Sequence, residues 1–193
     1  MKFDLIIVGV GGQGTILASN VIGISAVKEG IPIKAAETHG MAQRGGSVEN
    51  HVRIGCKYGP LIPKGSADAL LGFEPAEAVK HSHFLSRDGV AIINTEKIIP
   101  LSTTSKGFKY PDIDYLISEF KRVFKNVITL NAAGLAREAG SIMTVNTVML
   151  GVLTRYLPIK ERIIVETITE LVPKKLVEVN LRAFEAGRNV VAA

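Results

Sequence analysis

The strongest constraint on the fold is a glycine turn placed directly after an apolar run. Phe3–Val8 is a nearly unbroken apolar run rich in β-branched residues, which is typical of a strand buried on both faces of a parallel sheet. The next six residues read GVGGQG, and Thr15–Lys28 then carries apolar residues at helical spacing. Gly9, Gly11 and Gly14 therefore match G-x-G-x-x-G between a strand and a helix. This order predicts a phosphate-binding turn in an α/β fold.

The predicted turn offers backbone amides to a ligand and no reactive side chain. Its glycines permit a tight turn and close approach, and free N–H groups at the helix start attract a phosphate or a carboxylate. Gly12 and Gln13 lie inside the turn. The Gln13 amide either faces a bound group or closes the loop. The alternative for the glycines is that they only let helix and strand pack closely. We take all five residues as candidate ligand contacts: Gly9, Gly11, Gly12, Gln13 and Gly14.

The stretch after the second predicted strand departs from a dinucleotide-binding fold. Glu37 follows the predicted strand Ile31–Ala36, where an acidic residue would bind a ribose. Only the loop THGMAQRGG separates Glu37 from Ser47–Ile54, which alternates polar and mostly apolar side chains. A crossover to a parallel strand takes about a dozen residues or more. We therefore predict an antiparallel third strand at the sheet edge, and the NAD-binding interpretation weakens.

The rest of the chain alternates strands with helices and then becomes helical. The predicted strands are Ala67–Phe73, Gly89–Asn94 and Val127–Leu130, and the predicted helices include Pro75–Phe84 and Asp112–Phe124. From Met143 onward the pattern is helical throughout. We predict a three-layer α/β fold with a Rossmann-like sheet, mostly parallel with an antiparallel edge strand. We interpret residues 1–193 as one domain, with 143–193 as a helical C-terminal region.

Charge and aromatic content argue against a nucleic-acid-binding protein. The net charge is +5, but aromatic residues make up only 6% of the chain and tryptophan is absent. Proteins that bind single strands need stacking aromatics, and duplex binders carry a denser basic helix or arm. We therefore expect an anionic small molecule or an acidic partner, and no nucleic acid.

Cysteine usage and hydropathy limit the cofactors and the compartment. The lone Cys56 excludes an internal disulfide and any cysteine-ligated cluster built from this chain alone. The longest apolar stretch, 142–157, is interrupted by Asn146, Thr147 and Arg155 and is too short to cross a bilayer. The first residues show no signal-peptide cleavage site. We expect no membrane association and a cytoplasmic location.

Three blocks of the sequence together resemble a known family. GVGGQG, ETHGMAQRGGSV and HVRIG, at these spacings, resemble the gamma-type subunit or domain of 2-oxoacid:ferredoxin oxidoreductases, most closely the small (beta) subunit of the indolepyruvate enzymes. Pyruvate-type relatives often carry an arginine after the first loop glycine, where this chain has Val10. That departure favours the arylpyruvate branch.

The resemblance implies a reaction and a set of partners. The complex would decarboxylate an arylpyruvate, transfer the acyl group to coenzyme A and reduce ferredoxin. Thiamine diphosphate, magnesium and [4Fe-4S] clusters would lie on a large (alpha) partner subunit, so this chain would be inactive alone. Coenzyme A is the one co-substrate that this chain is expected to touch. A dimer of heterodimers is one arrangement that the resemblance allows.

The central block supplies the side-chain candidates. Glu37 and His39 flank the end of the second strand, and Arg44 precedes Gly45 in a glycine-rich loop. The Arg44 fork suits a phosphate or carboxylate, although a salt bridge to the partner subunit explains it equally well. His39 also suits a hydrogen bond to the turn's own backbone. We take Arg44 and Gly45 as cofactor contacts, and Glu37, His39 and Arg44 as accessory candidates for catalysis.

Two other polar features receive less functional weight. His81 and His83 are two residues apart on a predicted helix and should face different directions, so no metal site is expected. His51 and Arg53 share the polar face of the third strand, which we expect to be a solvated edge or a subunit interface. Two further functions stay open from the residues: a self-sufficient NAD-dependent oxidoreductase and a non-enzymatic nucleotide-binding regulatory module.

Overall fold

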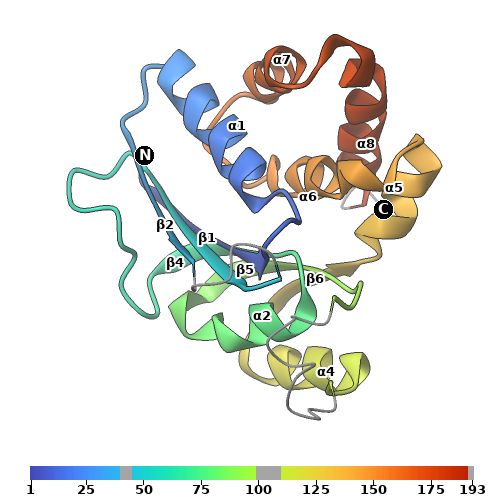
Figure 1. The fold of residues 1–193 in the computed structure, drawn as a ribbon. Coiled ribbons are helices and arrows are strands. Elements are labelled where there is room, and N and C mark those ends of the chain that lie inside the picture. Colours follow the sequence, from blue (N-terminus) through green and yellow to red (C-terminus); the bar gives the residue numbers. More distant parts are fainter. Residues whose placement is uncertain (40–44, 99–109, 191–193) are drawn as a thin grey trace.

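The protein is an α/β structure built on one twisted sheet (Figure 1). The computed structural model describes residues 1–39, 45–98 and 110–190, except for the side chain of His39. The described strands lie side by side in the order β2-β3-β1-β4-β5-β6. Their bounds are β1 Phe3–Val10, β2 Ile33–His39, β3 Ser47–Ile54, β4 Ala67–Gly72, β5 Leu85–Asn94 and β6 Asn126–Leu130.

Helices cover both faces of the sheet and make three layers. One face packs against α1 and α5–α8, and the other packs against α2 and α4 (Figure 1). The bounds are α1 Thr15–Lys28, α2 Pro75–Lys80, α4 Ile113–Val123, α5 Ala132–Ala139, α6 Val145–Leu153, α7 Glu161–Leu171 and α8 Val177–Asn189, with 3-10 turns at Ser82–Phe84, Ile142–Thr144 and Lys174–Leu176. The larger apolar core lies on the α1 side and the smaller core on the α2 side.

The predicted fold class and the antiparallel strand are confirmed, and one detail is corrected. Strands β1, β4, β5 and β6 run parallel, and β3 runs antiparallel to both of its neighbours. However, β3 lies second in the sheet, and β2 occupies the edge. The register explains this order, since β3 pairs with β1 along its whole length, from Phe3↔Ile54 to Val10↔Ser47. β2 is then left to pair with the outer side of β3.

Helix boundaries agree with the sequence where capping signals are local. Helix α1 has the predicted bounds, and Gly30 follows it with φ 70°, a left-handed value that favours glycine. The side chain of Asp112 caps α4 by accepting from the Tyr115 N–H at 3.1 Å. The predicted helix 75–84 instead ends at Lys80 and continues as a 3-10 turn, because Phe84 N–H bonds to His81 O three residues earlier.

Two glycines allow the C-terminal helices to pack closely. A Cβ on Gly151 of α6 would overlap the carbonyl oxygen of Phe184, and one on Gly187 of α8 would overlap that of Val148. The backbones of α6 and α8 therefore cross in direct contact. This contact fixes α8 over α6, whose residues from Asn146 to Leu153 are all buried. The start of α6 is thereby held beside the glycine turn.

Candidate ligand-binding site and exposed apolar surface

The glycine turn is closed by the side chain of Gln13. The Val10 N–H donates to Gln13 Oε1 at 2.7 Å, and Gln13 Nε2 donates to the Phe73 carbonyl at 2.9 Å. A Cβ on Gly9 would come within 2.8 Å of Gln13 Oε1, so glycine is required there for this closure. Of the two interpretations of Gln13, the geometry supports loop closure, since its amide is engaged with the backbone.

The remaining glycines of the turn leave its backbone open. Gly12 and Gly14 have φ 105° and 80°, values that L side chains rarely adopt. A Cβ on Gly12 would meet nothing within 4 Å, whereas one on Gly14 would lie 2.9 Å from the Asn146 side-chain nitrogen. Helix α1 starts at Thr15 with no side-chain cap and no acidic residue in its first turn. Its leading N–H groups are therefore suited to an anion.

A short backbone bridge ties the end of the central loop to the turn. Gly11 N–H donates to Gly46 O at 2.8 Å, and Gly45 N–H donates to Gly11 O at 3.2 Å. The next residue, Ser47, pairs with Val10 in the β1–β3 ladder. Gly45 therefore lies against the glycine turn, as expected of two motifs that serve one site.

A hollow of about 640 Å³ opens beside the turn, between α1 and the β2–β3 strands. It is lined by Gly11, Gly12, Gly14, Thr15, Ile16, Leu17, Asn20, Glu37 and Val48. An anionic group of a ligand fits beside the backbone amides of the turn. The opposite wall carries the Glu37 carboxylate, which repels anions and accepts hydrogen bonds from hydroxyl or amino groups. The hollow can therefore hold a ligand with a phosphate at one end and donors at the other.

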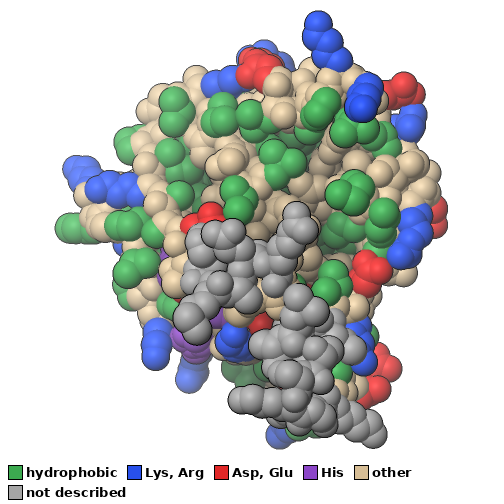
Figure 2. Space-filling model, viewed as in Figure 1, with side chains coloured by type: hydrophobic (Ala, Val, Ile, Leu, Met, Phe, Trp, Pro, Cys, Tyr) green, Lys and Arg blue, Asp and Glu red, His purple; other side chains and the backbone are tan. Residues whose placement is uncertain are grey.

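A second, more apolar hollow of about 380 Å³ lies on the other side of the turn. Its lining includes Leu17, Ile98, Ile142, Met143 and Asn146. Met143 is 80% exposed, and Ile142 is also exposed, as is Ile16 near the first hollow. Figure 2 shows hydrophobic side chains gathered over the helical side of the molecule, with Lys and Arg mainly at the margin. Exposed apolar side chains around a binding turn are typical of a protein interface.

The structure corrects the expectation for the polar face of β3. His51 and Arg53 were expected on a solvated edge or at a subunit interface, yet within this chain alone they are already only 2% and 6% exposed. Arg53 forms a bidentate pair with the buried Asp4 at 2.9 and 3.1 Å and also donates to Gly59 O and Leu61 O. The loop between β3 and β4 covers this face and brings Ile62 into its core. The alternation of polar and apolar side chains therefore showed correctly which residues share this face of β3, but it did not predict that the face is buried.

The two histidines of the α2 region also differ from expectation. The rings of His81 and His83 were expected to face different directions, but they stack with centroids 6.3 Å apart. The reason is that α2 ends at Lys80, so helical spacing does not apply beyond it. Among the described residues no group of three or more His, Cys, Asp or Glu side chains is placed to hold a metal ion.

The structure brings most of the predicted site residues together. Glu37 and the glycines Gly9, Gly11, Gly12, Gly14 and Gly45 meet around the turn. Arg44 and the side chain of His39 lie outside the described residues. Sequence reasoning missed Asn20 and Asn146. Asn20 follows Ile16 by one helical turn, which was a usable signal. Asn146 interrupts an apolar stretch, but only the fold brings it to Gly14.

The order of strands bears on the NAD-dependent alternative. That reading required a crossover helix and a parallel third strand after Glu37. β3 instead runs antiparallel to β1 and directly beside it. The sheet therefore keeps the parallel β1–α1–β2 unit but lacks the second crossover of a dinucleotide fold, from β2 to a parallel third strand. Within the described part of the chain, no helix has the length and apolar character needed to span a membrane.

Comparison with known proteins places the chain in a family. The model of the pyruvate ferredoxin/flavodoxin oxidoreductase family matches residues 4–190. The chain belongs to this family. It is 44% identical over 191 residues to the indolepyruvate oxidoreductase subunit IorB of Archaeoglobus fulgidus, covering 98% of this chain and 95% of that protein. The resemblance inferred from the glycine turn and the central block is thus confirmed.

Two proteins of Thermococcus kodakarensis separate branches of the family. Its indolepyruvate oxidoreductase subunit IorB is 38% identical to this chain, over 96% of this chain and 94% of that protein. Its pyruvate/ketoisovalerate oxidoreductases common subunit gamma is 28% identical, over 94% of this chain and 92% of that protein. Within one organism, the indolepyruvate subunit is therefore the more similar of the two.

Solved structures share the fold at low sequence identity. The gamma subunit of a keto/oxoacid ferredoxin oxidoreductase from Geobacter sulfurreducens superposes with a TM-score of 0.73 at 23% identity, covering 99% of both chains. A 2-oxoglutarate:ferredoxin oxidoreductase from Magnetococcus marinus, solved with coenzyme A bound, gives 0.74 at 18% identity. It matches 99% of this chain but 31% of that one, so the same fold also forms part of a longer chain.

Proposed function

We propose that this chain is the small subunit of an arylpyruvate:ferredoxin oxidoreductase that acts on indolepyruvate. The observation that carries the proposal is the end-to-end similarity to curated indolepyruvate oxidoreductase subunits, which exceeds that to the pyruvate/ketoisovalerate subunit of the same organism. In the reaction, the 2-oxoacid and coenzyme A give acyl-CoA, carbon dioxide, a proton and two electrons, and the electrons reduce ferredoxin.

The partner is a large subunit that holds the redox groups. Thiamine diphosphate with magnesium would supply the decarboxylation chemistry there, and [4Fe-4S] clusters would pass the electrons on. The lone Cys56 is buried in this chain, and a cluster takes about four cysteine ligands. The exposed Ile16, Ile142 and Met143 around the turn are a suitable docking surface for that subunit. In a cytoplasmic dimer of heterodimers, this surface would be buried against the large subunit, and ferredoxin would still reach the clusters of that subunit.

The part proposed for this chain is to bind coenzyme A at the glycine turn. The N–H groups at the start of α1 would receive a phosphate, and Arg44, next to Gly45, would pair with it bidentately. A protein with the same fold binds coenzyme A, which supports this assignment. Glu37 on the opposite wall of the hollow would accept from donors of the ligand. The chain thus holds the acyl acceptor and contributes no reacting atom.

The direct test is reconstitution with the large subunit. We expect no turnover by the isolated chain, and coenzyme A-dependent ferredoxin reduction with indolepyruvate after the large subunit is added. Activity of the chain alone with NAD would contradict the proposal, as would a complex that prefers pyruvate.

The coenzyme A assignment has a separate test in the same complex. Arg44→Ala removes a charge-assisted contact of about 1.5–3 kcal/mol, so the KM for coenzyme A should rise roughly ten- to a hundredfold. Arg162→Ala, at an exposed arginine of α7, is the matched control and should leave the KM unchanged. An unchanged KM in Arg44→Ala would remove Arg44 from the site without affecting the subunit assignment.

A further inference from the structure

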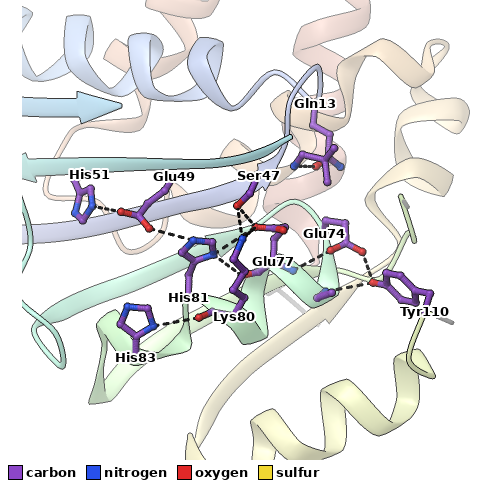
Figure 3. A network of polar contacts seen from close by, with 12 residues as sticks. Gln13, Ser47, Glu49, His51, Glu74, Glu77, Lys80, His81, His83 and Tyr110 are labelled. Atoms are coloured by element: carbon purple, nitrogen blue, oxygen red, sulfur yellow. Dashed lines mark hydrogen bonds and ion pairs between the residues drawn. The ribbon is translucent and has the colours of Figure 1, made fainter. Parts of the chain in front are cut away.

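The face of β3 turned toward α2 is joined to it by polar contacts (Figure 3). Ser47 and Glu49 alternate along this face of β3, and Glu77 and His81 lie opposite on α2 and at its end. Ser47 Oγ donates to Glu77 Oε2 at 2.5 Å, and His81 Nε2 lies 3.1 Å from Glu49 Oε2. These groups are buried or half-buried. The stability of the contact between β3 and α2 therefore depends on which of these side chains carry protons.

The protonation of His51, the next residue along this face, follows from its partners. The Ile62 N–H donates to His51 Nδ1 at 3.1 Å, so Nδ1 carries a lone pair. Its Nε2 lies 2.6 Å from Glu49 Oε1 and must carry the ring proton, because a carboxylate accepts hydrogen bonds. His51 is thus the neutral Nε2–H tautomer, and it satisfies one oxygen of Glu49.

The contacts of His81 require one proton more. His81 Nδ1 lies 2.9 Å from the Glu77 carbonyl, which only accepts, so Nδ1 is protonated. His81 Nε2 faces the second oxygen of Glu49, which also accepts. A second proton must lie in this contact to avoid opposing lone pairs. A proton on Nε2 of this ring satisfies the contact, because both ring nitrogens of His81 then donate.

The surrounding charges are consistent with an imidazolium at His81. Glu49 faces it from β3, and the Glu77 carboxylate lies 3.6 Å from Nδ1 on α2. The ring of His83 stacks beside it from the following 3-10 turn. Lys80 is the nearby cation, and its exposed ammonium bonds to Ser47 and Glu77. Two carboxylates are therefore balanced by Lys80 and His81 together.

The network ends at the backbone that frames the glycine turn. Ser47 pairs with Val10, and the preceding Gly46 accepts from Gly11 N–H. We propose that His81 is a positioning residue, whose imidazolium holds Glu49 and Glu77 and so fixes the end of β3 that shapes the turn. The proposal concerns the geometry of the turn and is independent of which ligand the turn binds.

Imidazole nitrogen signals of ¹⁵N-histidine-labelled full-length protein test the protonation states. At neutral pH we expect both nitrogens of His81 to be protonated, and His51 to show a protonated Nε2 and a free Nδ1. In Glu49→Gln, the new amide donates to His81 Nε2, so that nitrogen should lose its proton while His51 is unchanged. His83→Gln, at an exposed ring, should leave the His81 signals as in the parent protein. A singly protonated His81 in the parent protein would overturn the proposal.

Hydrogen exchange of the Gly11 amide tests the positioning role. Its protection should fall about tenfold in His81→Gln, because a charge-assisted contact is lost, and should not change in His83→Gln. Unchanged protection in both His81→Gln and Glu49→Gln would show that the network does not position the turn and would refute the proposal.

Discussion

The two faces of β3 differ in what lies against them. Val52 and Ile54 turn toward α1 and enter the larger apolar core, and Val48 is also buried. On the other face, His51 and Arg53 turn toward the loop before β4 and are equally buried. Apolar side chains need only close packing, whereas buried polar groups need specific partners. The first face therefore tolerates small changes of shape, and the second should tolerate almost no loss of a partner.

Breaking the Asp4–Arg53 pair should give the largest effect. Arg53→Ala leaves Asp4 buried and removes the bonds to Gly59 O and Leu61 O. Loss of one partner of a buried pair costs about 3–5 kcal/mol of unfolding free energy, measured by urea denaturation. Arg122→Ala, in an exposed pair with Glu119, is the matched control and should show no measurable change. The double variant Asp4→Leu/Arg53→Met should regain most of the loss.

If Arg53→Ala were no more harmful than Arg122→Ala, the polar face would be solvated in solution. That outcome would restore the expectation drawn from the sequence. If the double variant were as unstable as the single one, the loop bonds of Arg53 rather than its charge would hold this face.

The next prediction concerns Asn50, the polar exception on the apolar face. Asn50 is 2% exposed, and no described residue provides a hydrogen-bond partner for its Nδ2. A buried unpaired donor costs about 1–3 kcal/mol, so Asn50→Val should stabilise the protein by about 1 kcal/mol. The control on the same face is Ile54→Val, which should destabilise it by about 0.5–1.5 kcal/mol. Thermal unfolding of the two variants measures this contrast.

Asn50 also lies next to residues that line the candidate site. It pairs with Glu37 across β2–β3 and lies two residues from Val48, and both line the larger hollow. If Asn50→Val is more stable and its complex binds coenzyme A normally, the Asn50 amide is needed neither for folding nor for ligand binding. A loss of stability instead would show that the unpaired amide has a partner in solution.

Features set by local interactions could be predicted from the sequence, whereas features set by contacts between distant residues could not. The bounds of α1 and the antiparallel direction of β3 followed from local signals, namely helical spacing and a loop too short for a crossover. The inner position of β3 depends on its pairing with β1, and the burial of Arg53 depends on Asp4, 49 residues away in the chain, so neither followed from local signals. Gln13 likewise closes the turn through Phe73, 60 residues away. A motif identifies the turn, but only the fold shows which of its groups are left for a ligand.

The smallest change is expected at Glu74, a second buried carboxylate on the polar side of the sheet. Burial raises the pKa of Glu74, although hydrogen bonds from Tyr110 O–H and Glu77 N–H act against it. Burial would also raise the pKa of Asp4, but hydrogen bonds and charges from Arg53 and Lys2 outweigh it and lower that pKa. The two acids therefore respond to pH in opposite directions.

The sign of each response follows from linkage. Asp4 binds its proton less readily when folded, so its contribution is present above its ordinary pKa of 3.8 and is lost as the pH falls through the lowered value. Glu74 binds its proton more readily when folded, so its contribution is present below its ordinary pKa of 4.5 and is lost as the pH rises.

Glu74→Gln keeps an acceptor for Glu77 N–H and removes the charge. The variant should gain stability relative to the parent protein above about pH 4.5 and not below it, in urea titrations across this range. A gain that is the same at all pH values would mean that folding does not raise the pKa of Glu74, and a uniform loss would mean that the carboxyl group itself, and not its charge, is needed to cap α2.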